Sequence, residues 1–131
     1  MLATPEDLID KYRGNTDVSV YRSGEAHVIE FGRQNISVKV TVPDEVLEWF
    51  VDVHQSGQLV AQDWCDYCGY DQTPIEDLTR DMAEEVDQFL ARLLATKLRV
   101  TQRDKTWIFG RKKSILESLD GGGWRQAVPF L

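Results

Sequence analysis

The chain has 131 residues, of which 42% are hydrophobic and 28% charged, a composition typical of a globular protein and not of a disordered one. Chains of this length usually form one core, so we expect a single domain over residues 1–131. No apolar run reaches the roughly 20 residues that span a bilayer, and residues 1–7 lack the features of a signal peptide. We therefore expect a cytoplasmic protein that does not contact membranes.

The net charge of −7 is unevenly distributed along the chain. Residues 63–91 carry nine acidic side chains and one basic one, whereas residues 92–131 carry nine basic and three acidic side chains. The acidic middle repels phosphate backbones, which argues against direct nucleic-acid binding there, and it attracts a basic partner. The basic part either neutralises the acidic segment within the fold or forms a second surface, and the sequence is compatible with both.

The N-terminal third predicts a short helix followed by strands. Thr4 is a suitable N-cap and Pro5 a suitable first helical residue, with acidic side chains in the first turn. Apolar residues then alternate with polar ones over residues 18–21, 27–31 and 36–42. Because successive side chains of a strand point to opposite faces, this alternation predicts three strands joined by turns.

The middle of the chain predicts a hairpin and then a long helix. Residues 46–54 fit both periods, and their β-branched and aromatic content favours a strand. Ser56 and Gly57 indicate a hairpin turn into a second arm at residues 59–61. Thr73 followed by proline opens a helix of about 23 residues. Its predicted buried stripe is Ile75, Leu78, Met82, Val86, Phe89, Leu90, Leu93 and Leu94.

The C-terminal third predicts a hairpin between residues 98–101 and 106–109, followed by one or two helical turns within residues 114–119. Gly121–Gly123 indicates a hinge, with residues 124–131 as a flexible tail. We therefore expect an α+β fold. An antiparallel sheet of about five to seven strands in hairpins should pack against one long amphipathic helix, with a short N-terminal helix.

The segment Asp63–Asp71 holds three aromatic residues, three aspartates and both cysteines. Trp64 and the CxxC spacing of Cys65 and Cys68 resemble the core of thioredoxin-like proteins, but the helix starts several residues later and the aspartates raise a thiol pKa. A zinc site would need more ligands, for which His54 is a candidate. We interpret the cysteines as small apolar residues, with a zinc-binding or thiol-redox protein as the alternative.

Recognition is the function that this segment favours. The sequence contains no GxSxG, P-loop, GxGxxG after a strand or HExxH motif, so we expect no enzyme activity and no cofactor. Trp64, Tyr67 and Tyr70 are large amphipathic side chains among aspartates, which is the composition of protein-binding hot spots. In an alternative interpretation, the aromatic side chains cap the core and the acidic ones keep the protein in solution.

Residues 46–71 resemble bacterial immunity proteins of polymorphic toxin systems. The resemblance rests on Trp49-Phe50-Val51-Asp52-Val53, the turn at Gly57 and Asp63-Trp64-Cys65-Asp66-Tyr67. It implies a cytoplasmic protein that binds a basic toxin domain, such as a nuclease, and occludes its active site. The binding residues that it implies, in the central segment and then as a rim on the long helix, are Asp63, Trp64, Asp66, Tyr67, Tyr70, Asp71, Asp77, Asp81 and Glu84.

Overall fold

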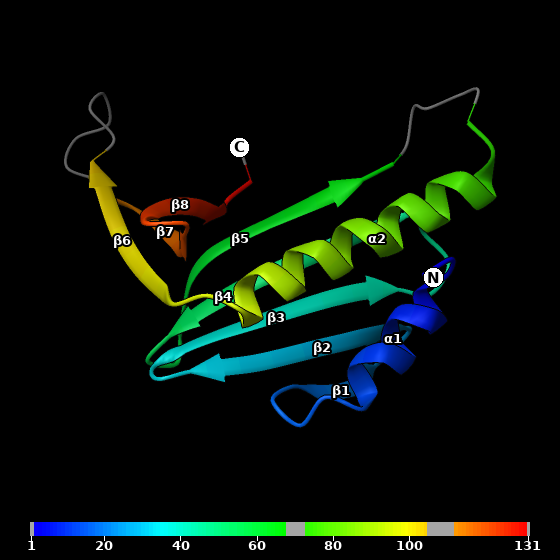
Figure 1. The fold of residues 1–131 in the computed structure, drawn as a ribbon, viewed down its shortest axis with the longest axis horizontal. Coiled ribbons are helices and arrows are strands. Elements are labelled where there is room, and N and C mark those ends of the chain that lie inside the picture. Colours follow the sequence, from blue (N-terminus) through cyan, green and yellow to red (C-terminus); the bar gives the residue numbers. More distant parts are fainter. Residues whose placement is uncertain (1, 68–72, 105–111, 131) are drawn as a thin grey trace.

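The structure is a computed structural model that describes residues 2–67, 73–104 and 112–130. These residues form two helices and eight strands in two antiparallel sheets, so the expected α+β class is confirmed (Figure 1). The strand order is β1-β2-β3-β4-β5 in the larger sheet and β6-β7-β8 in the smaller one. In chain order the elements are α1 (Pro5–Arg13), β1 (Ser19–Ser23), β2 (Ala26–Arg33), β3 (Ile36–Pro43), β4 (Glu48–Gln55), β5 (Gln58–Asp66), α2 (Ile75–Leu94), β6 (Leu98–Asp104), β7 (Lys112–Asp120) and β8 (Gly123–Val128).

Helix α1 begins with a capping box. The Thr4 hydroxyl accepts a hydrogen bond from the Asp7 amide at 3.2 Å, and the Asp7 carboxylate accepts one from the Thr4 amide. Pro5 occupies the first turn, where its missing N–H has no intrahelical partner to lose. The start of α1 is thus where the sequence predicts it.

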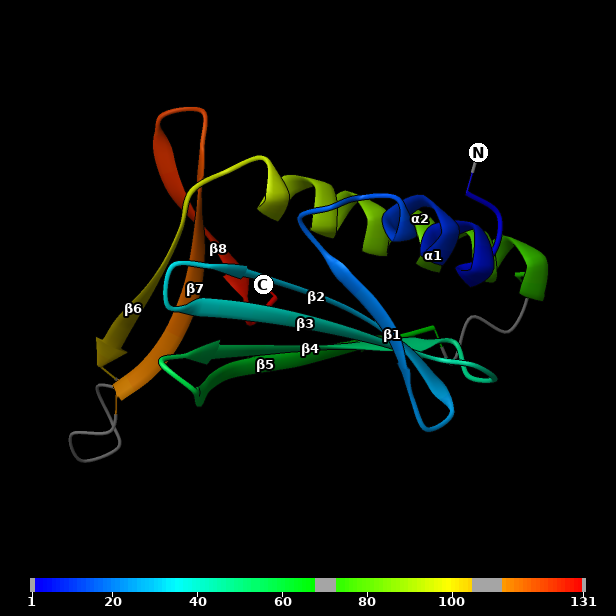
Figure 2. The same cartoon turned by 90° about the horizontal axis from the view of Figure 1, so that it is seen from below.

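The larger sheet has a buried inner face and a more exposed outer face. Along β3, Ile36, Val38, Val40 and Val42 are buried, whereas the residues between them are only partly buried. Figure 2 shows both helices on one side of this sheet, which we call the inner face. No described helix or strand lies over the opposite side, which we call the outer face.

Helix α2 buries most of the predicted apolar stripe against the inner face, but Ile75, at the start of that stripe, is 68% exposed. Its buried residues include Leu78, Met82, Val86, Leu90 and Leu93, each at most 9% exposed. The helix is 20 residues long and shorter than expected: it begins at Ile75, its N-cap position is held by a proline, and no side chain caps it.

The smaller sheet differs from the helical turns and flexible tail expected in this part of the chain. Residues 112–120 form β7, in which the consecutive residues Ile115 and Leu116 are both buried. A strand buried on both faces loses the two-residue alternation, which explains why the sequence does not predict it. The expected hinge is a hairpin turn in which Gly121 and Gly122 take positive φ angles, and residues 123–128 form β8. The predicted strand at 106–109 lies outside the described residues. The described strands before and after it, β6 and β7, pair with each other.

Candidate functional site

The outer face carries three cross-strand pairs of acidic, aromatic and amide side chains on β4 and β5. In the central pair, the rings of Phe50 and Trp64 stack with centroids 6.4 Å apart and planes 22° apart. Positions two residues apart on a strand share a face, so the neighbouring pairs lie on either side of this stack. The three pairs, which we call the acidic–aromatic ladder, are Glu48 with Asp66, Phe50 with Trp64, and Asp52 with Gln62.

Trp64 is unusually exposed for a tryptophan. Its exposed fraction is 52%, although a tryptophan is usually largely buried. Beside it lies a hollow of about 520 Å³. The lining residues are Thr41, Phe50, Asp52, Gln62, Asp63 and Trp64. The ladder therefore offers both a flat aromatic surface and a concave space next to it.

The Glu48–Asp66 pair places two carboxylates opposite each other. Neither side chain forms an ion pair with any described residue, and like charges in directly opposed positions destabilise a sheet. A cation from outside the chain would remove this repulsion. The pair is therefore suited to a positively charged ligand.

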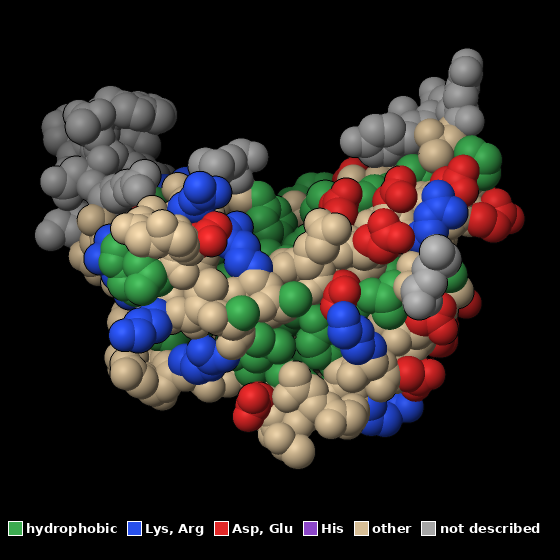
Figure 3. All heavy atoms as spheres, viewed as in Figure 1, with side chains coloured by type: hydrophobic (Ala, Val, Ile, Leu, Met, Phe, Trp, Pro, Cys, Tyr) green, Lys and Arg blue, Asp and Glu red, His purple; other side chains and the backbone are tan. Residues whose placement is uncertain are grey.

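Charges of opposite sign collect at opposite ends of the molecule. Figure 3 shows Asp and Glu side chains gathered over the helices at one end and Lys and Arg side chains gathered over β6–β8 at the other. Many of the basic side chains of the C-terminal part of the chain thus lie on a surface that is separate from the acidic end of the molecule. Within it, the guanidinium of Arg99 lies 4.1 Å from the ring centroid of Trp124 and pairs with Glu117 at 2.9 Å.

Asp63 and Tyr67, two of the predicted binding residues, form hydrogen bonds within the fold. Asp63 accepts hydrogen bonds from the Trp64 amide at 2.8 Å and from the Phe130 amide at 2.6 Å. The Tyr67 side chain is buried. The structure therefore brings only Trp64 and Asp66 of this segment together on the outer face.

The predicted rim on α2 lies in the helix layer, on the far side of the sheet from Trp64. Asp77 pairs with Arg80 within α2 at 3.1 Å, and Asp81 is exposed. Glu84 lines a hollow between the two helices together with acidic residues of α1. The predicted binding residues therefore do not form one surface. Tyr70 and Asp71 lie outside the described residues.

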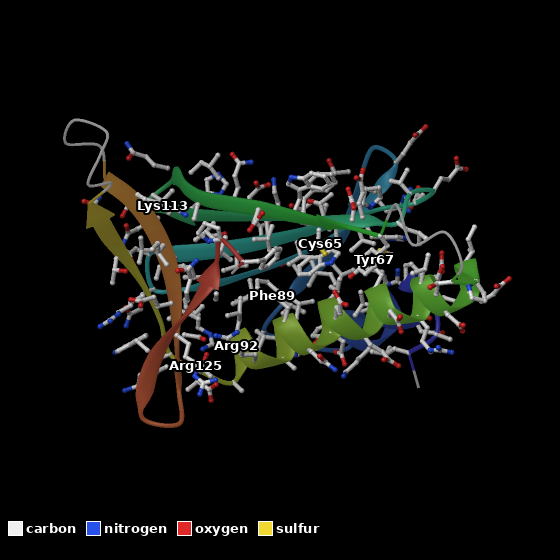
Figure 4. All side chains as sticks on the ribbon, turned by 90° about the horizontal axis from the view of Figure 1, so that it is seen from above. Cys65, Tyr67, Phe89, Arg92, Lys113 and Arg125 are labelled. Carbon is white, nitrogen blue, oxygen red and sulfur yellow. The ribbon has the colours of Figure 1, made fainter. Side chains whose placement is uncertain are left out.

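A second concave region, which we call the aromatic groove, lies between β5, α2 and the C-terminal segment (Figure 4). Cys65 faces this groove beside Tyr67 and Phe89. Burial raises the pKa of the Cys65 thiol, and the carboxylates of Glu85, Asp66 and Asp63 raise it further, whereas a hydrogen bond with Tyr67 lowers it. A thiol with a raised pKa forms little of the nucleophilic thiolate at neutral pH.

The residues considered for a zinc site are not brought together. His54 pairs with Leu59 near one end of β4, and Cys65 pairs with Trp49 near the other, five residues or about 17 Å away along a strand. Cys68 lies outside the described residues. Among those described, no group of three or more His, Cys, Asp or Glu side chains could hold a metal ion.

Four residues of the ladder were missed as site residues by the sequence reasoning: Glu48, Phe50, Asp52 and Gln62. The alternation of Glu48, Phe50 and Asp52 with the apolar Trp49, Val51 and Val53 is the signal that could have found the first three. Their partners on β5 could not be assigned without the register of the hairpin.

The observed fold is an α+β arrangement of two antiparallel sheets and two helices within the described residues. No protein-family model, curated protein or solved structure matches the chain. None of the described helices is long and apolar enough to cross a membrane.

Proposed function

We propose that this protein is a non-catalytic binding module that recognises a basic protein through the acidic–aromatic ladder. The observation that carries the proposal is the uncovered Glu48–Asp66 pair beside the stacked rings of Phe50 and Trp64. An arginine or lysine of the partner would gain a cation–π contact with Trp64 and an ion pair with Asp66. Desolvated aromatic anchors surrounded by charges are typical of the centres of protein interfaces.

The proposed partner is a toxin domain, and the proposed outcome of binding is occlusion of its active site in the cytoplasm. This step rests on the resemblance of residues 46–71 to immunity proteins and on the acidic character of the ladder. A toxin that cleaves nucleic acid needs a basic cleft, and that cleft would match the ladder in charge. The acidic end of the helix layer would add to the field that steers a basic partner toward the molecule.

The first test compares Trp64→Ala with Ile75→Ala. Ile75 lies at the start of α2 and is 68% exposed. Its replacement by alanine also removes an exposed apolar side chain, but in the helix layer, so this variant is the matched control. The partner to use is the protein encoded next to this one, with affinity measured by isothermal titration calorimetry. We expect Trp64→Ala to weaken binding by about 2 kcal/mol or more, and Ile75→Ala to leave it nearly unchanged. Equal effects of the two variants would remove the ladder from the interface.

A second test uses the repulsion between Glu48 and Asp66. We expect Asp66→Asn to stabilise the free protein by about 0.2–1 kcal/mol, because it relieves a like-charge pair, and at the same time to weaken binding of the basic partner. Urea unfolding measures the first effect and titration calorimetry the second. A variant that is less stable and binds normally would contradict the proposal on both counts.

A further inference from the structure

The aromatic groove is separate from the acidic–aromatic ladder, because it lies on the inner side of the sheet. Its volume is about 440 Å³. Trp49 forms its floor, with ring centroids 5.3 Å from Phe89 and 5.1 Å from Phe130, and the latter two rings meet edge to face at 5.7 Å. The remaining lining residues are Cys65, Glu85, Gln88 and Arg92. The centre of the groove is thus apolar and aromatic.

One end of the groove holds a cation without a counter-ion. Arg92 is half-buried, and its Nε donates to the Ser118 hydroxyl at 3.1 Å while one terminal nitrogen donates to the Gln126 carbonyl at 3.4 Å. Both acceptors are neutral, and no carboxylate among the described residues pairs with Arg92. Arginines removed from solvent are normally paired with an anion, so this arrangement leaves a charge to be neutralised.

A second arginine lies on the strand that pairs with β7. Arg125 on β8 is directly opposite Ser118 on β7, and Ser118 is the residue that Arg92 contacts. Figure 4 shows Arg92 and Arg125 at the same end of the groove, beyond Phe89. Arg125 has only a distant ion pair, with Asp120 at 3.7 Å. A carboxylate that reaches both arginines would form charge-assisted hydrogen bonds with each guanidinium group.

We propose that the aromatic groove binds a small carboxylate with an aromatic or apolar body. The carboxylate pairs with Arg92 and Arg125, and the body lies against Phe89 and Phe130 over the floor formed by Trp49. A pocket of this kind, mostly apolar with a few convergent polar groups, is the usual form of a small-molecule site.

The opposite end of the groove limits which carboxylates fit. Glu85 precedes Arg92 by seven residues, or about 10.5 Å along the helix axis. Its carboxylate accepts a hydrogen bond from Tyr67 at 2.5 Å and lies at that end of the groove. A second anionic group on the ligand would be repelled there, so the groove selects monocarboxylates over dicarboxylates of that length.

The test uses three probes that share the naphthalene ring and a two-carbon side group and differ in its terminal group: 2-naphthylacetic acid (as the carboxylate), 2-(2-naphthyl)ethanol and 2-(2-naphthyl)ethylamine (as the ammonium ion). Binding to the full chain is measured by titration calorimetry. We expect the carboxylate to bind tightest and the amine weakest. Arg92→Gln should weaken the carboxylate by about tenfold or more and the alcohol by no more than about threefold. Phe89→Ala should weaken both.

Two variants control for indirect effects. Arg125→Gln changes a side chain that is 71% exposed, so it tests the same charge with little risk to folding. Arg80→Gln removes a cation from α2 away from the groove and should leave the affinity for all three probes unchanged. Because the ladder is a separate surface, Trp64→Ala should leave probe binding intact, which distinguishes failure of this proposal from failure of the protein-binding one.

Three outcomes would overturn the inference. Equal affinity for the acid and the alcohol, unchanged in Arg92→Gln and Arg125→Gln, would mean that the groove is an apolar surface without anion recognition. Tightest binding of the amine would assign the specificity to Glu85. Absence of saturable binding by every probe would mean that the groove is not a ligand site.

Discussion

Two tyrosines are held in the core by carboxylates of α2. The Tyr12 hydroxyl donates to Asp87 at 2.7 Å, and the Tyr67 hydroxyl donates to Glu85 at 2.5 Å. Tyr67 also accepts a hydrogen bond from the indole N–H of Trp49 at 3.3 Å. In both cases burial, followed by the hydrogen bond to the carboxylate, raises the pKa of the hydroxyl well above its usual range.

The Tyr67→Phe variant tests the contribution of this hydroxyl to stability. Its loss leaves the buried indole N–H of Trp49 without that acceptor, and an unsatisfied buried donor costs about 1–3 kcal/mol. We expect the free energy of unfolding in urea to fall by that amount. Tyr21→Phe is the matched control, because Tyr21 is exposed and its bond to Glu30 is 3.1 Å long; it should cost less than about 0.5 kcal/mol. Equal losses of unfolding free energy in the two variants would mean that the buried hydrogen bonds of Tyr67 contribute no more to stability than the exposed one of Tyr21.

The raised pKa values also predict a loss of stability in alkali. Above the pKa of an unfolded tyrosine, about 10, the unfolded chain releases hydroxyl protons that native Tyr12 and Tyr67 retain. The unfolded state then binds fewer protons than the native state, so the free energy of unfolding decreases as the pH rises from about 9 to 11. Urea unfolding of the double variant Tyr12→Phe/Tyr67→Phe should show a shallower decrease. Identical slopes in the two proteins would contradict the prediction.

At the scale of elements, hydrogen bonds from Arg33 connect the C-terminal end of α2 to the larger sheet. Its guanidinium, at the end of β2, donates to the carbonyls of Leu94 and Thr96, the latter at 3.0 Å. The last carbonyls of a helix have no intrahelical partner, and a cation there also interacts favourably with the helix dipole. The link joins residues more than 60 positions apart, so it is invisible to local sequence patterns.

The Arg33→Met variant keeps most of the side-chain stem and removes the hydrogen bonds. We expect it to lower the free energy of unfolding by about 1–3 kcal/mol and to speed amide exchange in the last turn of α2. Arg13→Met removes an exposed ion pair with Asp10 and should cost less than about 0.5 kcal/mol. If both variants exchange at the wild-type rate, Arg33 does not hold the helix end.

The elements that could be predicted from the sequence are those with a local cause. The capping box at Thr4, the alternation from Ile36 to Val42 and the turn at Ser56 and Gly57 depend on neighbouring residues, and each lies where expected. The strand at residues 112–120 could not be predicted, because its burial depends on packing from both sides.

The candidate site depended on one irregularity in the hairpin of β4 and β5. A regular two-residue hairpin would pair Trp64 with Trp49 and place both on the inner face. The shift in register at Val53 and His54 pairs Trp64 with Phe50 and brings it to the outer face, while Cys65 turns inward. A one-residue slip reverses the facing of every side chain along a strand. The sequence contains no local signal for this bulge, so it could not predict which residues of β5 lie on the outer face.

At the scale of the whole molecule, Asp63 connects the two sheets. Its carboxylate bridges the amide of Trp64 on β5 and the amide of Phe130 beyond β8. Its bond to Trp64 satisfies one backbone donor of β5, an edge strand of the larger sheet. The sequence suggests Asp63 as a contact for a partner, whereas this geometry gives it a role within the fold.

Asp63→Ala distinguishes these two roles. If Asp63 holds the C-terminal segment, the variant should lose about 1–3 kcal/mol of unfolding free energy, and the Phe130 amide should exchange with solvent faster. Asp66→Ala, three residues further along β5 and on the outer face, should leave that amide unchanged and weaken binding of a basic partner more than Asp63→Ala does. Amide exchange read by mass spectrometry or NMR, together with titration calorimetry, separates the two effects. Unchanged exchange at Phe130 combined with strongly reduced partner binding in Asp63→Ala would instead place this carboxylate in the interface.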